Sequence, residues 1–93
     1  DGQTFTGFQL RQNYPNPFNP STTISFHLPT SQPVTLAVYD ITGRLVATLL
    51  NQQALTAGAH TVRFEAKDIP AGVYYYRLRT PEQTAVKKMV LVR

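Results

Sequence analysis

An alternation of apolar and polar residues with a period of two constrains the fold of this chain most strongly. Between Thr22 and Leu28, the apolar residues Ile24, Phe26 and Leu28 alternate with smaller polar ones. Because successive side chains of a β-strand point to opposite faces of a sheet, this pattern predicts a strand with one buried face. Proline, glycine and aspartate turn signals separate five further runs of this kind. These runs cover residues 34–39, 44–50, 61–66, 73–80 and 84–92.

The six runs, with a short seventh near residues 8–10, predict an all-β domain. Their close spacing is typical of an immunoglobulin-like antiparallel β-sandwich of six to seven strands, and a small barrel is the alternative. Tyr74 favours the sandwich, because its place just after Gly72 resembles a tyrosine corner. Only residues 52–56 are expected to form one helical turn. The alternation predicts a core of eight side chains: Ile24, Phe26, Leu36, Val38, Phe64, Tyr74, Tyr76 and Leu78.

Residues 13–20 interrupt the alternation with three prolines. Proline fixes φ, lacks an amide donor and drives the preceding residue into extended conformations, so neither a helix nor a central strand is possible here. We predict an extended, turn-rich ribbon. A flexible linker is the alternative, but Tyr14 and Phe18 argue against it because linkers are poor in aromatic residues.

The last run, residues 84–92, carries two adjacent lysines, Lys87 and Lys88. Neighbouring side chains on a strand point to opposite faces, so one lysine must point toward the core side. Natural edge strands use lysines to block unwanted pairing. We therefore predict that this strand lies at a sheet edge or rim, where it is accessible.

Composition limits the class of protein. The 93 residues are 42% hydrophobic, which suffices for one small core, and no apolar run reaches the roughly 20 residues of a membrane span. The chain has no cysteine, which excludes disulfides, thiolate metal sites and thiol nucleophiles. It begins without Met and is expected to be a piece of a longer polypeptide. The net charge is +4, and the last 17 residues hold five of the nine basic residues: Arg77, Arg79, Lys87, Lys88 and Arg93.

The titratable residues do not suggest catalysis. Asp40 and Asp68 stand in turn signals, where they cap backbone N–H groups. His27 and His60 are the only histidines, and neither has metal-ligand spacing. No nucleophile elbow or phosphate loop is present. We therefore predict no catalytic residue, no metal and no cofactor. An outer-face group of Tyr75, Arg77 and Arg79 is a candidate sugar-binding platform, the alternative being an ordinary solvated sheet face.

Five segments, taken in their order along the chain, match the motifs of a known family. They are LRQNYPNPFNPSTTI (10–24), VYDITGRLV (38–46), AGAH (57–60), GVYYYRL (72–78) and KKMVL (87–91). Together they closely resemble the type A C-terminal sorting domain of the type IX (Por) secretion system of Bacteroidetes-type bacteria, which is related to immunoglobulin-like modules of flagellar hook assembly. The resemblance implies a sorting motif at these positions: Pro15, Asn16, Pro17, Phe18, Asn19, Asp40, Gly43, Arg44, Gly72, Tyr74, Lys87, Lys88, Met89, Val90 and Leu91.

The resemblance also implies a function and partners. Residues 10–93 would form a noncatalytic sorting domain, and residues 1–9 a linker from the parent protein. The domain would direct a covalently linked upstream cargo across the outer membrane, through the periplasm, to the cell surface or the extracellular space. Its partners would be the outer-membrane secretion machinery, a sortase-like protease and an anionic surface glycan, with no nucleic acid. The rival hypothesis is an accessory carbohydrate-binding or cell-adhesion module that uses Tyr75, Arg77 and Arg79.

Overall fold

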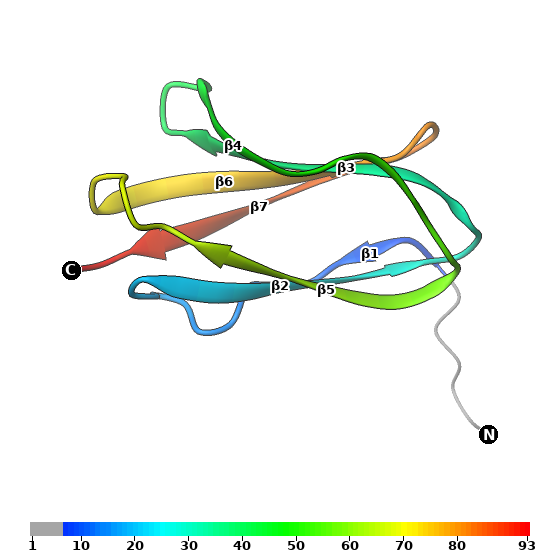
Figure 1. Ribbon diagram of the computed structural model, residues 1–93, viewed down its shortest axis with the longest axis horizontal. Coiled ribbons are helices and arrows are strands. Elements are labelled where there is room, and N and C mark those ends of the chain that lie inside the picture. The colour runs from blue at the N-terminus through cyan, green and yellow to red at the C-terminus, as the bar shows by residue number, and fades with distance from the viewer. Residues whose placement is uncertain (1–6) are drawn as a thin grey trace.

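A computed structural model describes residues 7–93, and over this range it contains seven strands and no helix (Figure 1). The strands form two antiparallel sheets with the orders β1-β2-β5 and β4-β3-β6-β7. The all-β sandwich is therefore confirmed, and the barrel alternative is wrong because the strands divide into two separate sheets. The strands are β1 (Gln9–Leu10), β2 (Ser21–Leu28), β3 (Gln32–Asp40), β4 (Leu45–Leu55), β5 (Gly58–Glu65), β6 (Gly72–Arg79) and β7 (Thr84–Leu91).

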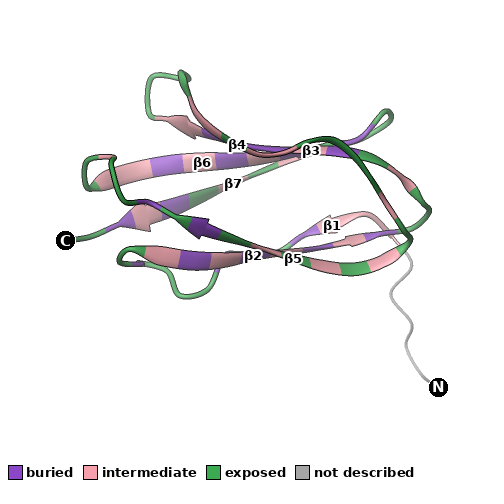
Figure 2. Ribbon diagram, viewed as in Figure 1, coloured by how far each residue is buried: buried purple, intermediate pink, exposed green. Residues whose placement is uncertain are grey.

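The core fills the space between the two sheets. All eight side chains predicted for it are buried, and in Figure 2 buried and less buried segments alternate along β2 and β6. The period-two pattern thus predicted correctly which face of each strand is buried. The core also includes residues from outside the predicted set, notably Leu10, Phe18, Leu28, Val34, Met89 and Leu91.

β4 departs from the sequence prediction. The helical turn expected at residues 52–56 is wrong, since β4 runs without a break from Leu45 to Leu55. The pairing of β4 with β3 continues to the end of β4, through Val34↔Gln53 and Gln32↔Leu55. Register shifts between the two strands lie nearer the start of β4. Gln52 has a φ of +47°, and its N–H donates to Thr35 Oγ1 at 3.1 Å. The irregular local sequence therefore forms bulged strand rather than helix.

The sandwich has one end at which several connections meet. The β3–β4 hairpin, the β5–β6 connection, the start of β2 and the end of β7 all lie there, beside the C-terminus (Figure 1). Pairing agrees, since Asp40 lies opposite Tyr74 and Gly72 opposite Leu91. We call this region the motif end, and define it as residues 13–20, 40–44, 66–74 and 87–93. Among residues 7–93, no helix is long and apolar enough to span a membrane.

Candidate functional site

The proline-containing ribbon lies along the outer edge of β7. The Phe18 N–H donates to the Val90 carbonyl at 2.9 Å, and the Val92 N–H donates to the Phe18 carbonyl at 3.0 Å. The Val90 N–H donates to Asn16 Oδ1 at 3.0 Å. Backbone groups that an edge strand would present to solvent are thus taken up by a segment more than 70 residues earlier in the chain. Two parts of the predicted sorting motif, Asn16 with Phe18 and Val90 with Leu91, are therefore in direct contact.

The side chain of Phe18 anchors the ribbon in the core. It is 1% exposed, and its ring centroid lies 6.2 Å from that of Phe64. The other predicted ribbon residues, Pro15, Asn16, Pro17 and Asn19, are exposed. The prediction of an anchored ribbon is confirmed for Phe18. It is wrong for Tyr14, whose side chain is 81% exposed.

A buried polar cluster holds the start of the ribbon. The Tyr76 hydroxyl accepts from the Asn13 N–H at 2.8 Å and donates to the Arg11 carbonyl at 2.7 Å. Asn13 Nδ2 donates to Thr22 Oγ1 at 2.9 Å. Burial raises the pKa of Tyr76 to about 12, because the phenolate would lose its hydration. The sequence prediction treated Tyr76 as a core filler and assigned no role to Asn13.

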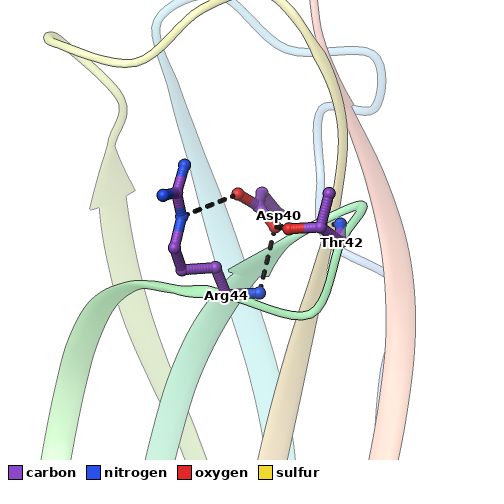
Figure 3. Close-up of polar contacts among 3 residues, drawn as sticks. All are labelled: Asp40, Thr42 and Arg44. Carbon is purple, nitrogen blue, oxygen red and sulfur yellow. Dashed lines mark hydrogen bonds and ion pairs between the residues drawn. The ribbon is translucent and has the colours of Figure 1, made fainter.

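The β3–β4 hairpin is organised by one carboxylate (Figure 3). Asp40 Oδ1 accepts from the Thr42 N–H at 2.9 Å, the Thr42 hydroxyl at 2.6 Å and the Arg44 N–H at 3.0 Å. Arg44 Nε lies 3.5 Å from Asp40 Oδ2. The Thr42 hydroxyl first, and then the Arg44 amide, lower the pKa of Asp40, because they bond to its charged form. Gly43 has a φ of +89°, which suits glycine. The predicted capping role of Asp40 is confirmed.

The tyrosine corner at the start of β6 lies opposite the β3–β4 hairpin. The Tyr74 hydroxyl donates to the Pro70 carbonyl at 2.6 Å, which confirms the sequence prediction. Gly72 begins β6 with a φ of +149°. A hollow of about 480 Å³ lies between this corner and the hairpin, and its lining includes Asp40, Arg44, Gly72 and Tyr74. Asp40 and Gly72, which lie 32 positions apart in the sequence, thus border the same concave surface.

The two lysines of β7 lie as the strand pattern predicts. β7 is the edge strand of its sheet. Lys87 is half-buried opposite Tyr76, whereas Lys88 is exposed opposite Tyr75. The expectation of an accessible last strand holds for the first half of β7 and is wrong for the second half. Besides the ribbon's contacts at Val90, Nε2 of Gln12 donates to the Lys88 carbonyl at 2.7 Å. The ribbon and the residue that precedes it therefore cover the second half of this edge.

The candidate sugar platform lies on the outer face of the four-stranded sheet. Tyr75 and Arg77 are half-buried, and Arg79 is exposed. Arg77 does not extend freely into solvent, because its guanidinium carbon lies 4.9 Å from the centre of the Tyr39 ring. Sequence reasoning missed Tyr39, which reaches Arg77 only through the pairing of β3 with β6.

The histidines lie apart from this surface. His27 Nδ1 is 3.0 Å from the Gly7 carbonyl, and His60 Nε2 is 2.7 Å from the Thr56 carbonyl. Within residues 7–93, no group of three His, Asp or Glu side chains is placed to hold a metal ion. That the domain needs no metal or cofactor remains a prediction.

Comparison with known protein families identifies the family of this chain. The family described as the secretion system C-terminal sorting domain matches residues 12–92. The chain belongs to this family. The match spans both the ribbon and β7, so it includes every residue of the motif end except Arg93. As a member, the chain is a C-terminal sorting signal of type IX secretion. Neither the curated proteins nor the solved structures contain a match.

Proposed function

We propose that this sorting domain directs a larger, covalently linked cargo through the periplasm and across the outer membrane to the cell surface or beyond. The outer-membrane secretion machinery and a sortase-like protease are its partners, and the domain itself catalyses no reaction. The observation that carries the proposal is the convergence of the motif segments. Residues 13–20, 40–44, 72–74 and 87–91 form one contiguous end of the sandwich, next to the C-terminus (Figure 1).

This convergence explains how a folded domain serves as a signal. The hollow between the hairpin and the tyrosine corner is bordered by Arg44, whose side chain is 83% exposed. The neighbouring ribbon presents Asn16 and Asn19 to solvent, and Lys88 lies exposed on the last strand. None of these side chains is needed to fill the core. They are therefore exposed to a partner that recognises the shape and charge of this end, although Asn16 also accepts from the Val90 N–H and Arg44 pairs with Asp40.

The first test removes the last segment. Deletion of Lys87–Arg93 from a full-length cargo should leave the cargo in the periplasm of a type IX-competent host, measured by cell fractionation. The deletion removes Met89 and Leu91 from the core, so it combines loss of signal with loss of fold. Normal surface delivery of the truncated cargo would refute the sorting function.

Surface variants separate signal from fold. Lys87→Ala with Lys88→Ala, and Arg44→Ala alone, should reduce delivery while the unfolding temperature of the isolated chain changes little. The matched control for Arg44→Ala is Arg63→Ala, which removes an exposed arginine that pairs with a carboxylate but lies outside the motif end. If Arg63→Ala impairs delivery as much as Arg44→Ala does, the secretion machinery recognises general positive charge rather than the motif end.

The anionic surface glycan and the carbohydrate-binding alternative remain predictions, to be tested separately. If Tyr75 forms a sugar platform, Tyr75→Ala should abolish binding to an insoluble polysaccharide. We expect no such binding by the native chain, because the guanidinium of Arg77 covers the adjacent Tyr39 ring. Saturable binding of a neutral glycan that depends on Tyr75 would favour the alternative.

A further inference from the structure

A second hollow, of about 430 Å³, lies on the outer face of the four-stranded sheet. Tyr39 of β3 and Tyr75 and Arg77 of β6 form its floor, and the hairpin beginning at Asp40 borders it on one side. Val86 of β7 lies in its lining as well. The residues of the floor are brought together by register, since Tyr39 pairs with Tyr75 and Arg77 with Val86.

Arg77 is held in a defined orientation at this site. Its Nη2 donates to the Tyr39 hydroxyl at 2.6 Å, and its guanidinium carbon lies 4.9 Å from the centre of the same ring. A guanidinium has five N–H donors in a rigid plane, and Tyr39 takes one of them. A fixed guanidinium loses little entropy when it binds a carboxylate through two parallel hydrogen bonds.

The charge around the hollow favours an anionic ligand. Lys88 lies opposite Tyr75, and Arg79 follows Arg77 on the same face of β6. The Asp40 carboxylate borders the hollow, but its Oδ1 accepts three hydrogen bonds within the hairpin and its Oδ2 faces Arg44. The remaining carboxylates of residues 7–93, at positions 65, 68 and 82, lie in β5, in the β5–β6 connection and in the β6–β7 turn. The floor is therefore positive.

The apolar rim distinguishes between classes of anionic ligand. Ile41 and Val86 are 70% and 54% exposed, and both line the hollow. A sugar ring stacks best on a flat, open aromatic face, and here Arg77 occupies the face of Tyr39. Aliphatic side chains beside Tyr and Arg are instead typical of protein–protein contacts.

We propose that this hollow binds an extended acidic segment of a partner protein. A Glu or Asp carboxylate of that segment bonds to Arg77, and aliphatic side chains two residues away contact Ile41 and Val86. Residues i and i+2 of an extended chain point to the same side, about 6.5–7 Å apart, so one face of a short peptide can supply both groups. The proposal goes beyond sorting, because it assigns a peptide ligand to the outer face of the four-stranded sheet.

The test is an NMR titration of the 15N-labelled chain with the peptide TVTETVT and its matched analogue TVTQTVT. We expect saturable shifts of the amides of residues 39–43, 75–77 and 86, with the glutamate peptide binding at least about tenfold more tightly, since a charge-assisted bond is lost in the glutamine analogue. Arg77→Ala should abolish these shifts. Tyr39→Phe, which keeps the ring and removes the hydroxyl partner of Arg77, should weaken them. Arg63→Ala, on the other sheet, should leave them unchanged.

Two results would overturn the proposal. One is the absence of shifts at these amides with the glutamate peptide, or equal shifts with both peptides. The other is tighter binding of tetragalacturonate at the same amides, which would assign the hollow to an acidic glycan. Because binding is measured without secretion, loss of delivery in cargo variants and loss of peptide binding here are independent results.

Discussion

The two outer edges of the four-stranded sheet are protected in different ways. The β7 edge is covered by the chain's own ribbon, through hydrogen bonds to Val90 and Val92 and the buried ring of Phe18. The β4 edge has no such cover among residues 7–93. It is bulged instead, with three register shifts against β3 and a positive φ at Gln52. Both devices discourage pairing with another sheet, but only the first links distant parts of the chain.

This difference shows why the sorting segments depend on one another. The ribbon keeps its shape because β7 supplies hydrogen-bond partners, and the second half of β7 is an internal strand only while the ribbon lies beside it. Damage to either segment should therefore disturb the other. Damage to β4 should remain local, because nothing beyond β3 pairs with it.

The largest effect is expected for Phe18→Ala. Truncation of a buried phenylalanine leaves a cavity and costs about 3–5 kcal/mol of unfolding free energy, and it also loosens the cover on β7. Urea unfolding measures the loss, and Tyr14→Ala is the matched control, since that exposed ring should contribute less than about 0.5 kcal/mol. Equal effects of the two substitutions would mean that the ribbon is not anchored.

Tyr76→Phe should have the next largest effect. It keeps the ring but leaves the Asn13 N–H and the Arg11 carbonyl without their partner, at a cost of about 1–3 kcal/mol. Tyr74→Phe is the control, because its hydroxyl makes a single bond, to Pro70. If Tyr76→Phe costs no more than Tyr74→Phe, the buried polar cluster does not hold the ribbon.

The hydroxyl of Tyr76 also predicts that the unfolding free energy falls at alkaline pH. The pKa of Tyr76 is about 12 in the folded chain and 10.0 for an ordinary tyrosine. The folded state therefore binds more protons than the unfolded state between these values, so stability is complete below about pH 10 and falls as the pH rises toward 12. Unfolding free energies measured across this range should decline less steeply in Tyr76→Phe. A wild-type curve that is no steeper would contradict the raised pKa.

Asp40→Asn tests the hairpin that joins β3 to β4. The charged form of Asp40 accepts the bonds from Thr42 and Arg44 more strongly than an amide does, so hydrogen exchange should accelerate at the Thr42 and Arg44 amides. Because the pKa of Asp40 is lowered on folding, its contribution is present above pH 3.8 and is lost as the pH falls further. Accelerated exchange in β7 would show that the hairpin is not a local unit.

The smallest effect is expected for a substitution at the β4 edge. Leu45→Lys places a charge on β4 at a position that is 55% exposed, and should change the unfolding free energy by less than about 0.5 kcal/mol. An edge lysine discourages strand pairing between molecules, so any association at high concentration, measured by analytical ultracentrifugation, should decrease. A large loss of stability would show that β4 is not independent of the rest.

Local sequence determined much of this molecule. The alternation in β2, β3 and β6 determined which face of each strand is buried, because a period of two assigns the apolar side chains to one face without reference to any other segment. The hairpin at Asp40 and the corner at Tyr74 were predictable for the same reason, since each is built from residues within five positions of one another. The resemblance placed the chain in its family before any geometry was known.

Tertiary structure alone decided which segments meet. The Asn16–Val90 bond, the Asn13–Tyr76 bond and the Arg77–Tyr39 contact join residues 38 to 74 positions apart, and each depends on strand order and register. The mistaken helical turn at residues 52–56 has the same origin: pairing with β3 supplies hydrogen bonds that local propensity does not reveal. Long-range pairing, which a local pattern does not encode, assembled the motif end.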